Sequence, residues 1–156
     1  MGEVVESVDV EVDVRTAYNQ WTQFEEFPRF MEGVERVEQL DDRHLRWQVD
    51  IGGVERSFEA EITEQTPDQR VAWTTESGPQ QSGVVTFHRL DDDLTRVTLQ
   101  MSFEPEGVSE HVADITGLVS SRAQGDMKRF KDFIEGRGEE TGAWRGKVER
   151  PGADVT

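Results

Sequence analysis

The feature that most constrains the fold is a long apolar stripe of helical period near the end of the chain, placed after a run of strand-like segments. Its members recur every three to four residues, a spacing that gathers them on one side of a helix. They are Val108, Val112, Ile115, Val119, Ala123, Met127, Phe130 and Ile134. The pattern predicts a helix over about residues 109–135, far longer than the roughly 11–12 residues of an average helix. Such a helix needs a large apolar surface on which to bury its stripe.

Residues 34–103 offer that surface, because they alternate apolar and polar residues with the period of two that half-buried strands have. In one run, for example, Leu45, Trp47 and Val49 share a face and the residues between them are polar. Short turn signals separate the runs, and the strongest of them, Gly52-Gly53, predicts a hairpin. Strands joined by short turns pair antiparallel, since a parallel connection needs a dozen or more residues. Six antiparallel strands are therefore expected here.

A strand and two short helices are expected before these six strands. Residues 3–12 alternate as a strand, and Asp13 is predicted to follow as an N-cap whose carboxylate accepts free amides of a first short helix. Residues 27–31 read as a second short helix, with Pro28 in its first position and Gly33 as its stop. The order predicts an α+β fold, in which a curved antiparallel sheet of about seven strands (β-α-α-β6-α) wraps around a long C-terminal helix.

The domain is expected to span residues 1–138, because Gly136 and Gly138 end the long helix. Residues 139–156 contain further glycines, a proline and one large apolar residue, Trp144. This composition predicts an irregular C-terminal tail that Trp144 would pin to the domain.

The charge of the chain narrows its expected partners. It carries 33 acidic and 17 basic residues, a formal net charge of −16. Nucleic acids and anionic membrane surfaces attract basic proteins, so neither is an expected partner. No apolar run approaches the roughly 18 residues of a membrane span, and the acidic residues 1–6 are unlike a signal peptide. We therefore expect a cytoplasmic protein, and one sequence does not indicate its oligomeric state.

Residues that would support metal or cofactor chemistry are sparse. The absence of cysteine excludes disulfides, thiolate catalysis and Cys-based zinc sites. No glycine-rich phosphate loop is present. His44, His88 and His111 fall on different predicted elements without ligand spacing. Neither a metal nor a cofactor is expected, and no Ser-His-Asp arrangement can be read.

Several polar side chains fall in phase with the inward-facing residues of their strands: Glu6, Arg56, Thr75 and Arg89. A charge buried alone is unfavourable, so an inward Arg or Glu needs a partner or a wet cavity. Arg56 or Glu6 would then orient a polar ligand head, or polarise a carbonyl to favour enolisation and ring closure. The alternative is that both lie at strand ends, where they reach water or pair with each other.

Large apolar side chains are expected on the same inward face. They would line a slot for a flat or isoprenoid ligand, or simply fill the core as large aromatics usually do. Residues 24–31 would close the mouth of this slot as a lid, or pack on the sheet. The predicted ligand-binding residues are Trp47, Arg56, Phe58, Trp73, Thr75, Phe87 and Met101.

Several runs of residues have counterparts in a known superfamily. They are residues 21–31 (WTQFEEFPRFM), 34–37 (VERV), Pro67, Ala72-Trp73, 83–87 (GVVTF), 129–135 (RFKDFIE) and 141–146 (TGAWRG). Together with the order of elements, they resemble the START-like or SRPBCC superfamily, whose fold is the helix-grip. The nearest branch is that of the polyketide cyclases/dehydrases, which includes coenzyme Q-binding START-like proteins, and the tail resembles bacterial members. The resemblance covers nearly the whole chain and implies the fold; most of its residues are packing and turn residues, so it does not assign an activity.

Two main functions follow as hypotheses. The first is a binding module that holds a hydrophobic small molecule, such as a polyketide, lipid or quinone, between helix and sheet. The second is an enzyme, a polyketide cyclase or dehydratase of the aromatase type, which would use the same pocket and need an acid/base pair inside it. The inward polar residues, even with His88 added, show no recognisable catalytic spacing, so binding is favoured. A third hypothesis, an interaction domain, would follow if the aromatics fill the core completely.

Overall fold

The computed structural model describes residues 2–31, 33–51, 54–76, 81–103 and 112–148. They form an α+β fold of strands, two α-helices and a short 3-10 helix. In chain order the elements are β1 (Gly2–Val10), α1 (Val14–Trp21), the 3-10 helix η1 (Phe24–Arg29), β2 (Val34–Gln39), β3 (His44–Ile51), β4 (Val54–Thr66), β5 (Arg70–Thr75), β6 (Gln81–Asp91), β7 (Leu94–Phe103) and α2 (Val112–Arg137).

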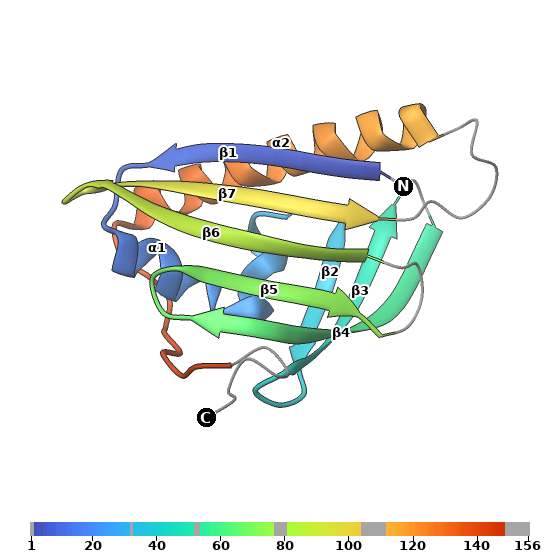
Figure 1. Cartoon of the computed structure of the whole chain (residues 1–156), viewed down its shortest axis with the longest axis horizontal. Coiled ribbons are helices and arrows are strands. Elements are labelled where there is room, and N and C mark those ends of the chain that lie inside the picture. Colours follow the sequence, from blue (N-terminus) through green and yellow to red (C-terminus); the bar gives the residue numbers. More distant parts are fainter. Residues whose placement is uncertain (1, 32, 52–53, 77–80, 104–111, 149–156) are drawn as a thin grey trace, which may run out of the picture.

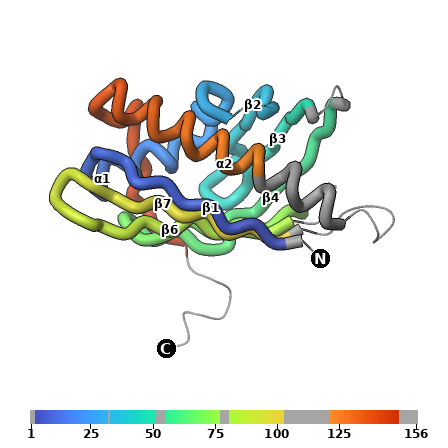
Figure 2. Tube along the Cα trace, turned by 90° about the horizontal axis from the view of Figure 1, so that it is seen from above, coloured from blue at the N-terminus to red at the C-terminus, as the bar shows by residue number. Residues whose placement is uncertain are grey.

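The strands form an antiparallel sheet in the order β1-β7-β6-β5-β4-β3-β2. Each strand from β3 to β7 pairs with its predecessor in the chain, and β1 pairs with β7 at the far edge. In Figure 1, α2 passes behind β1 and β7. Figure 2, turned by 90°, shows α2 between β1 on one side and β2 and β3 on the other. The sheet therefore curls around the long helix, which confirms the predicted architecture.

The predicted stripe of α2 is buried wherever its side chains are described. Ala123, Met127, Phe130 and Ile134 all belong to the buried core. The helix ends at Arg137, because Gly138 has a φ of +76° and stops it. Val108 lies outside the described residues, as do the side chains of residues 112–120.

A β-bulge in β4 helps the sheet to curl. The pairing of β4 with β5 shifts between Ile62 and Glu64, so the strand changes phase there. After the bulge Gln65 is buried, whereas strict alternation would have buried Glu64. Such a bulge bends and twists its strand, which suits a sheet that has to close around a helix.

The segment between β1 and β2 differs from its predicted details. Asp13 occupies the N-cap position of α1, but its side chain makes no capping hydrogen bond, and only its backbone oxygen accepts an amide. The second helix begins at Phe24, and Pro28 lies inside it instead of opening it. A 3-10 helix has three residues per turn, so it directs Phe24 and Phe27 to the same buried side. Gly33 has a φ of +88°, as expected of a stop.

Two further predicted boundaries shift by a few residues. β1 ends at Val10, two residues before the predicted end, because the amide of Glu11 turns from the sheet to the carboxylate of Glu135 on α2 (2.7 Å). Gly52 and Gly53 lie outside the described residues, but Ile51 and Val54 on either side of them pair with each other.

The tail at residues 139–148 is irregular yet attached to α1 through polar side chains. Gln20 Nε2 donates to Thr141 Oγ1 (3.0 Å), and the amide of Thr141 donates back to Gln20 Oε1 (2.8 Å). Arg145 donates to Asn19 (2.6 Å) and to Asp68 (2.7 Å). These bonds explain why α1 buries the amides of Asn19 and Gln20 at little cost.

The tail also reaches the sheet, where Val148 and Gln65 exchange two backbone hydrogen bonds. Neither described helix is both long enough and apolar enough to cross a membrane.

Candidate ligand-binding site

A cavity of about 260 Å³ lies between the concave face of the sheet and α2. Its walls come from the helical segment before β2, from strands of the sheet and from α2, and they are mostly apolar. The lining residues are Trp21, Phe24, Phe27, Met31, Val34, Leu45, Trp47, Val49, Phe58, Ile62, Val71, Trp73, Gln81, Leu99, Met101, Arg122, Ala123, Asp126 and Met127. The third sequence hypothesis, a completely filled core, is therefore not what the structure shows.

One wall of the cavity is flat and aromatic. Trp47 on β3 and Phe58 on β4 are register partners, so their side chains stand on the same face of the sheet. Their rings are stacked at 6.0 Å with an interplanar angle of 7°. Phe27 of η1 lies at 5.6 Å from the Trp47 ring, tilted by 47°. A planar ligand would find a parallel aromatic surface here.

A second large ring, Trp73 on β5, depends on a glycine across the sheet. Trp73 pairs with Gly83 on β6. A Cβ atom at Gly83 would lie 2.6 Å from the indole ring and 2.8 Å from the carbonyl oxygen of Gln100. Only glycine therefore lets the indole lie across β6 while it lines the cavity.

Three lining residues carry polar or charged side chains: Gln81 on β6, and Arg122 and Asp126 on α2. Arg122 and Asp126 are four residues apart and so share one side of the helix. Asp126 forms an ion pair with Arg129. Arg129 also donates to the backbone oxygen of Phe30 (3.0 Å), which ties this part of α2 to the end of η1.

These three residues were missed in the sequence, although a signal for them existed. Arg122 and Asp126 fall within the apolar stripe, adjacent to Ala123 and Met127. Gln81 is a polar residue in phase with inward-facing residues of its strand, the buried Val85 and Phe87. Thr75 was predicted as a site residue on the same ground.

Four of the seven predicted ligand-binding residues line the cavity: Trp47, Phe58, Trp73 and Met101. The structure places the other three elsewhere. Phe87 is buried in the core, with its ring 5.4 Å from that of Tyr18 and 6.5 Å from that of Trp21. Thr75 is outside the lining, and its Oγ1 accepts a hydrogen bond from the backbone amide of Gln81 (3.0 Å). Arg56 is exposed, near the start of β4.

The other inward-phase polar residues also lie outside the lining. Glu6 on β1 is half-buried opposite Leu99. Arg89 is exposed at the far end of β6, where it forms an ion pair with Asp92. Arg89 lies near the end of β6 (Gln81–Asp91), whereas Glu6 lies in the middle of β1 (Gly2–Val10), so the predicted strand-end position is wrong for Glu6.

The described histidines lie apart from the cavity. His88 is exposed on β6, and His111 lies outside the described residues. His44 Nδ1 lies 2.8 Å from Asp41 Oδ1, and His44 Nε2 lies 3.7 Å from Glu76. The hydrogen bond with Asp41 raises the pKa of the His44 imidazole above 6.5, although burial opposes this shift.

The segment predicted as a lid forms one end of the cavity wall. Phe24, Phe27 and Met31 all line the cavity, and the two phenylalanine rings are 5.4 Å apart. Both phenylalanines are buried, whereas Met31 is only half-buried. A gating role for residues 24–31 stays a prediction.

One group of acidic residues has the proximity that a cation site needs. Carboxylate oxygens of Glu35, Asp50 and Glu55 lie within 4.8 Å of one another. Desolvation and the charges of Glu55 and Asp50 raise the pKa of Glu35. Glu35 and Glu55 are exposed, and an exposed acidic group of this kind is common without an ion.

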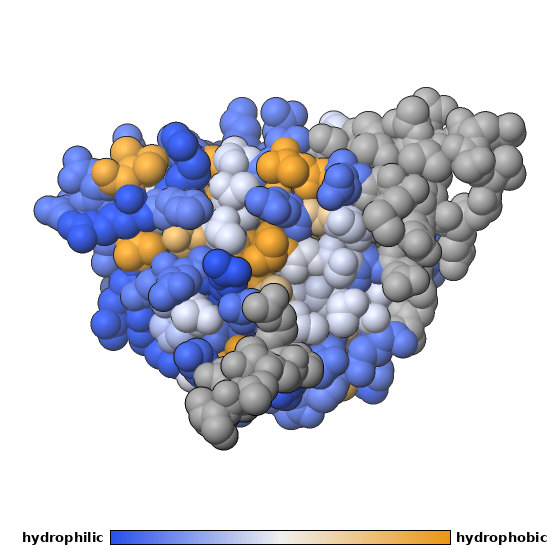
Figure 3. All heavy atoms as spheres, viewed as in Figure 1, coloured by the Kyte–Doolittle hydropathy of each residue, from blue (hydrophilic) through white to orange (hydrophobic). Residues whose placement is uncertain are grey.

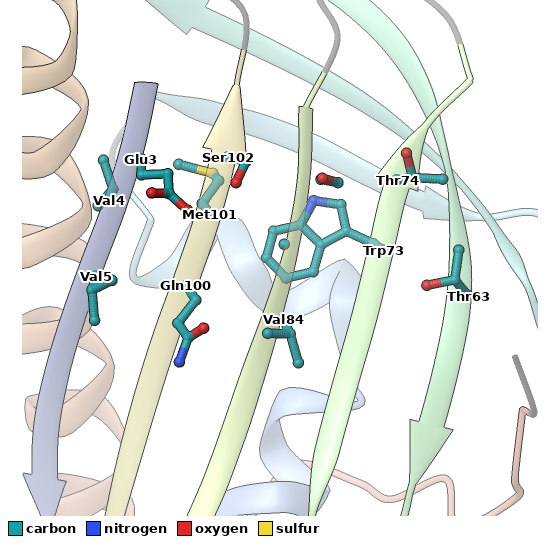
Figure 4. A pocket seen from close by; sticks show the side chains of 12 residues that line it. Glu3, Val4, Val5, Thr63, Trp73, Thr74, Val84, Gln100, Met101 and Ser102 are labelled. Carbon is teal, nitrogen blue, oxygen red and sulfur yellow. The ribbon is translucent and has the colours of Figure 1, made fainter. Parts of the chain in front are cut away.

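A second hollow of about 350 Å³ lies on the outer face of the sheet. Figure 4 shows Val5, Gln100, Val84 and Thr63 on the strands that form it. Several of its lining residues carry hydroxyl groups, and Val5 is 64% exposed. Figure 3 shows small orange apolar patches separated by blue and white atoms on this face. It lacks the enclosed apolar walls of the cavity beside α2 and is the weaker candidate for an apolar ligand.

The chain is similar to known proteins in sequence. Residues 10–132 match the family described as "Polyketide cyclase / dehydrase and lipid transport". An uncharacterized 17.2 kDa protein of Streptomyces lincolnensis is 60% identical over 149 residues, which cover 95% of this chain and 99% of that protein.

Solved structures share the fold. The Zhui aromatase/cyclase of Streptomyces sp. R1128 aligns with a TM-score of 0.77 and 15% identity, covering 91% of this chain and 98% of that one. A protein of Deinococcus radiodurans aligns with a TM-score of 0.69 and 26% identity, covering 86% and 98% of the two chains. A START superfamily protein of Mycobacterium smegmatis aligns with a TM-score of 0.68 and 16% identity, covering 88% and 97%.

Proposed function

Because this chain belongs to the polyketide cyclase/dehydrase and lipid-transport family, we propose that it binds a hydrophobic small molecule of the polyketide, lipid or quinone type. The observation that carries the proposal is the apolar cavity of about 260 Å³ between the sheet and α2. Most ligand sites are concave, mainly apolar and supplied with a few polar groups, and this cavity has all three properties.

The size of the cavity favours a compact ligand. An engineered cavity of about 150 Å³ binds benzene, and typical ligand pockets measure about 300–1,000 Å³. A cavity of about 260 Å³ therefore suits one or two rings without movement of the walls. A long acyl or isoprenoid chain would have to extend out of it.

The shape of the walls favours a flat ligand. The Trp47 and Phe58 rings are nearly parallel, with planes only 7° apart, so a flat ligand can stack parallel to both of them. Aromatic pairs contribute about 0.5–1.5 kcal/mol beyond the burial of their area, and an aliphatic ligand would forgo that term. Among the hydrophobic ligand classes, we therefore favour an aromatic or quinone-like ring system.

A second candidate function, that of a polyketide cyclase or dehydratase, is favoured by Arg122 and Asp126. Asp126 is a candidate general base, although its ion pair with Arg129 weakens it, and the guanidinium of Arg122 would stabilise the negative charge that develops on an enolising carbonyl. Both side chains line the cavity. They supply the acid/base candidates that the inward-phase strand residues did not.

Native mass spectrometry of freshly purified protein, followed by solvent extraction, tests the binding proposal. We expect a stoichiometric small molecule that is lost on denaturation, or uptake of an added bicyclic aromatic when the protein is isolated empty. Absence of both, at probe concentrations that saturate a micromolar site, would contradict the proposal. Arg56 is exposed and outside the lining, so Arg56→Ala is expected to retain the ligand; loss of the ligand would instead support the head-group contact predicted from the sequence.

The enzyme alternative needs a different readout. Incubation with a reactive poly-ketone should yield a cyclised product with the wild type and much less with Asp126→Asn. Equal product from wild type and variant would contradict a general-base role for Asp126.

A further inference from the structure

The carboxamide of Gln81 is one polar group on the sheet side of the cavity; the buried indole N–H of Trp47 on β3, which has no hydrogen-bond partner among the described residues, is another. Gln81 stands at the start of β6, in phase with the buried Val85 and Phe87, so its side chain belongs to the inward face. The charged lining residues, Arg122 and Asp126, belong to α2 on the opposite side. A ligand between sheet and helix would therefore meet Gln81 at one wall and the charged side chains of Arg122 and Asp126 at the other.

The position of Gln81 is fixed through its backbone. Its amide donates to Thr75 Oγ1 at 3.0 Å, which joins the beginning of β6 to the end of β5. This contact leaves the carboxamide of the side chain available for other partners. Thr75 is thus placed to hold Gln81, although Thr75 itself does not line the cavity.

The side-chain amide of Gln81 has a poor acceptor. Its Nε2 lies 2.8 Å from the thioether sulfur of Met101. A thioether is a weak acceptor, and a primary amide gains more from an oxygen. Gln81 is half-buried at the cavity wall, so an oxygen atom of a ligand would be a better partner for this donor than the sulfur or a carbon atom.

We propose that Gln81 is a specificity-determining residue of the cavity, with Nε2 donating a hydrogen bond to a carbonyl or hydroxyl oxygen of an aromatic ligand. This assignment deepens the proposed function and rests on it. The cavity then selects oxygenated ring systems, such as phenols and aryl ketones, over hydrocarbons of the same size. Met101 acts as the placeholder acceptor that the ligand oxygen replaces.

The test compares two probes that differ in one group, 2-naphthol and 2-methylnaphthalene, by titration monitored through tryptophan fluorescence. The variant Gln81→Leu removes the hydrogen-bond donor and replaces the carboxamide with an apolar side chain of similar size. Gln100→Leu is the matched control, because it makes the same substitution at an exposed position on the outer face of the sheet. The quantity measured is the ratio of the dissociation constants of the two probes.

Gln81→Leu is expected to shift this ratio about fivefold against 2-naphthol, as the loss of one neutral hydrogen bond implies. Gln100→Leu is expected to leave the ratio unchanged. Binding of both probes with the same ratio in wild type and Gln81→Leu would overturn the assignment alone. Binding of neither probe to the wild type would overturn the proposed function and the assignment with it.

Discussion

Filling the cavity should stabilise the protein and weaken ligand binding at the same time. Ala123 lies on the α2 wall and is buried, so a larger side chain there would extend into the cavity. The cavity of about 260 Å³ is a loss of packing stability, because the side chains around it lack contacts on one side. Ala123→Leu recovers part of it, because its three added carbons contribute about 0.8 kcal/mol each and ordering the side chain costs about 0.5–1 kcal/mol.

The net gain is therefore about 1.5 kcal/mol, which raises Tm by roughly 3–6 °C for a domain of this size. Leucine and alanine have similar helix propensities, so the backbone of α2 adds little to the change. Thermal and urea unfolding measure the first effect, and titration with 2-naphthol measures the second, which should be a severalfold loss of affinity. Gln124→Leu, at an exposed position of α2, is the matched control and should change neither. Destabilisation by Ala123→Leu would refute the reasoning about the empty volume, and unchanged affinity would refute the location of the ligand.

Three further predictions concern the fold around the cavity. Gln20→Ala removes both hydrogen bonds to Thr141 and should lower the free energy of unfolding in urea by about 2 kcal/mol; an unchanged value would mean that the tail is not attached in solution. Gly83→Ala places a methyl group 2.6 Å from the indole ring of Trp73. It should lower the free energy of unfolding by about 1–3 kcal/mol in the same assay. An unchanged value would show that the indole moves away freely. NMR titration should give His44 a pKa above 6.5 that falls in Asp41→Asn, because the raised pKa comes first from the Asp41 hydrogen bond; stability from this pair is present below pH 6.5 and is lost as pH rises through the folded-state pKa.

The architecture could be predicted because it depends on periodicity. The stripe of α2 predicted the long helix, and its buried members Met127, Phe130 and Ile134 confirm the side that faces the sheet. Alternation with a period of two predicted the antiparallel strands. The bulge at Ile62 and Glu64 could not be predicted, since it is set by how the strand must bend around α2 and not by local propensity.

Part of the cavity wall followed from the sequence and part did not. Trp47 and Phe58 could be placed because bulky apolar residues at inward positions of central strands reach the cavity. Arg56 obeys the same phase, yet it lies near the start of β4, where the side chain is exposed. Phase along a strand fixes the face of a residue but not its distance from the centre of the sheet. Arg122 and Asp126 could not be placed in this way, because the helical period of the stripe selects only its apolar members. These two residues directly precede Ala123 and Met127 and are polar.

The tail shows a different limit of sequence reasoning. Its glycine-rich composition predicted irregular structure, and residues 139–148 are irregular. The polar contacts that hold it, such as Gln20 with Thr141 and Arg145 with Asp68, join residues far apart in the chain. No local pattern encodes such pairs, although the buried amides on α1 require partners from somewhere.

The central claim, that an aromatic ligand binds between the sheet and α2, is tested most directly by methyl NMR during titration with 2-naphthol. The methyl groups of Leu45, Ile62 and Leu99 line the cavity and should shift, whereas those of the exposed Val5 and Leu90 should stay in place. Shifts confined to Val5 and its neighbours on the outer face, or no shifts at saturating probe concentration, would contradict the account.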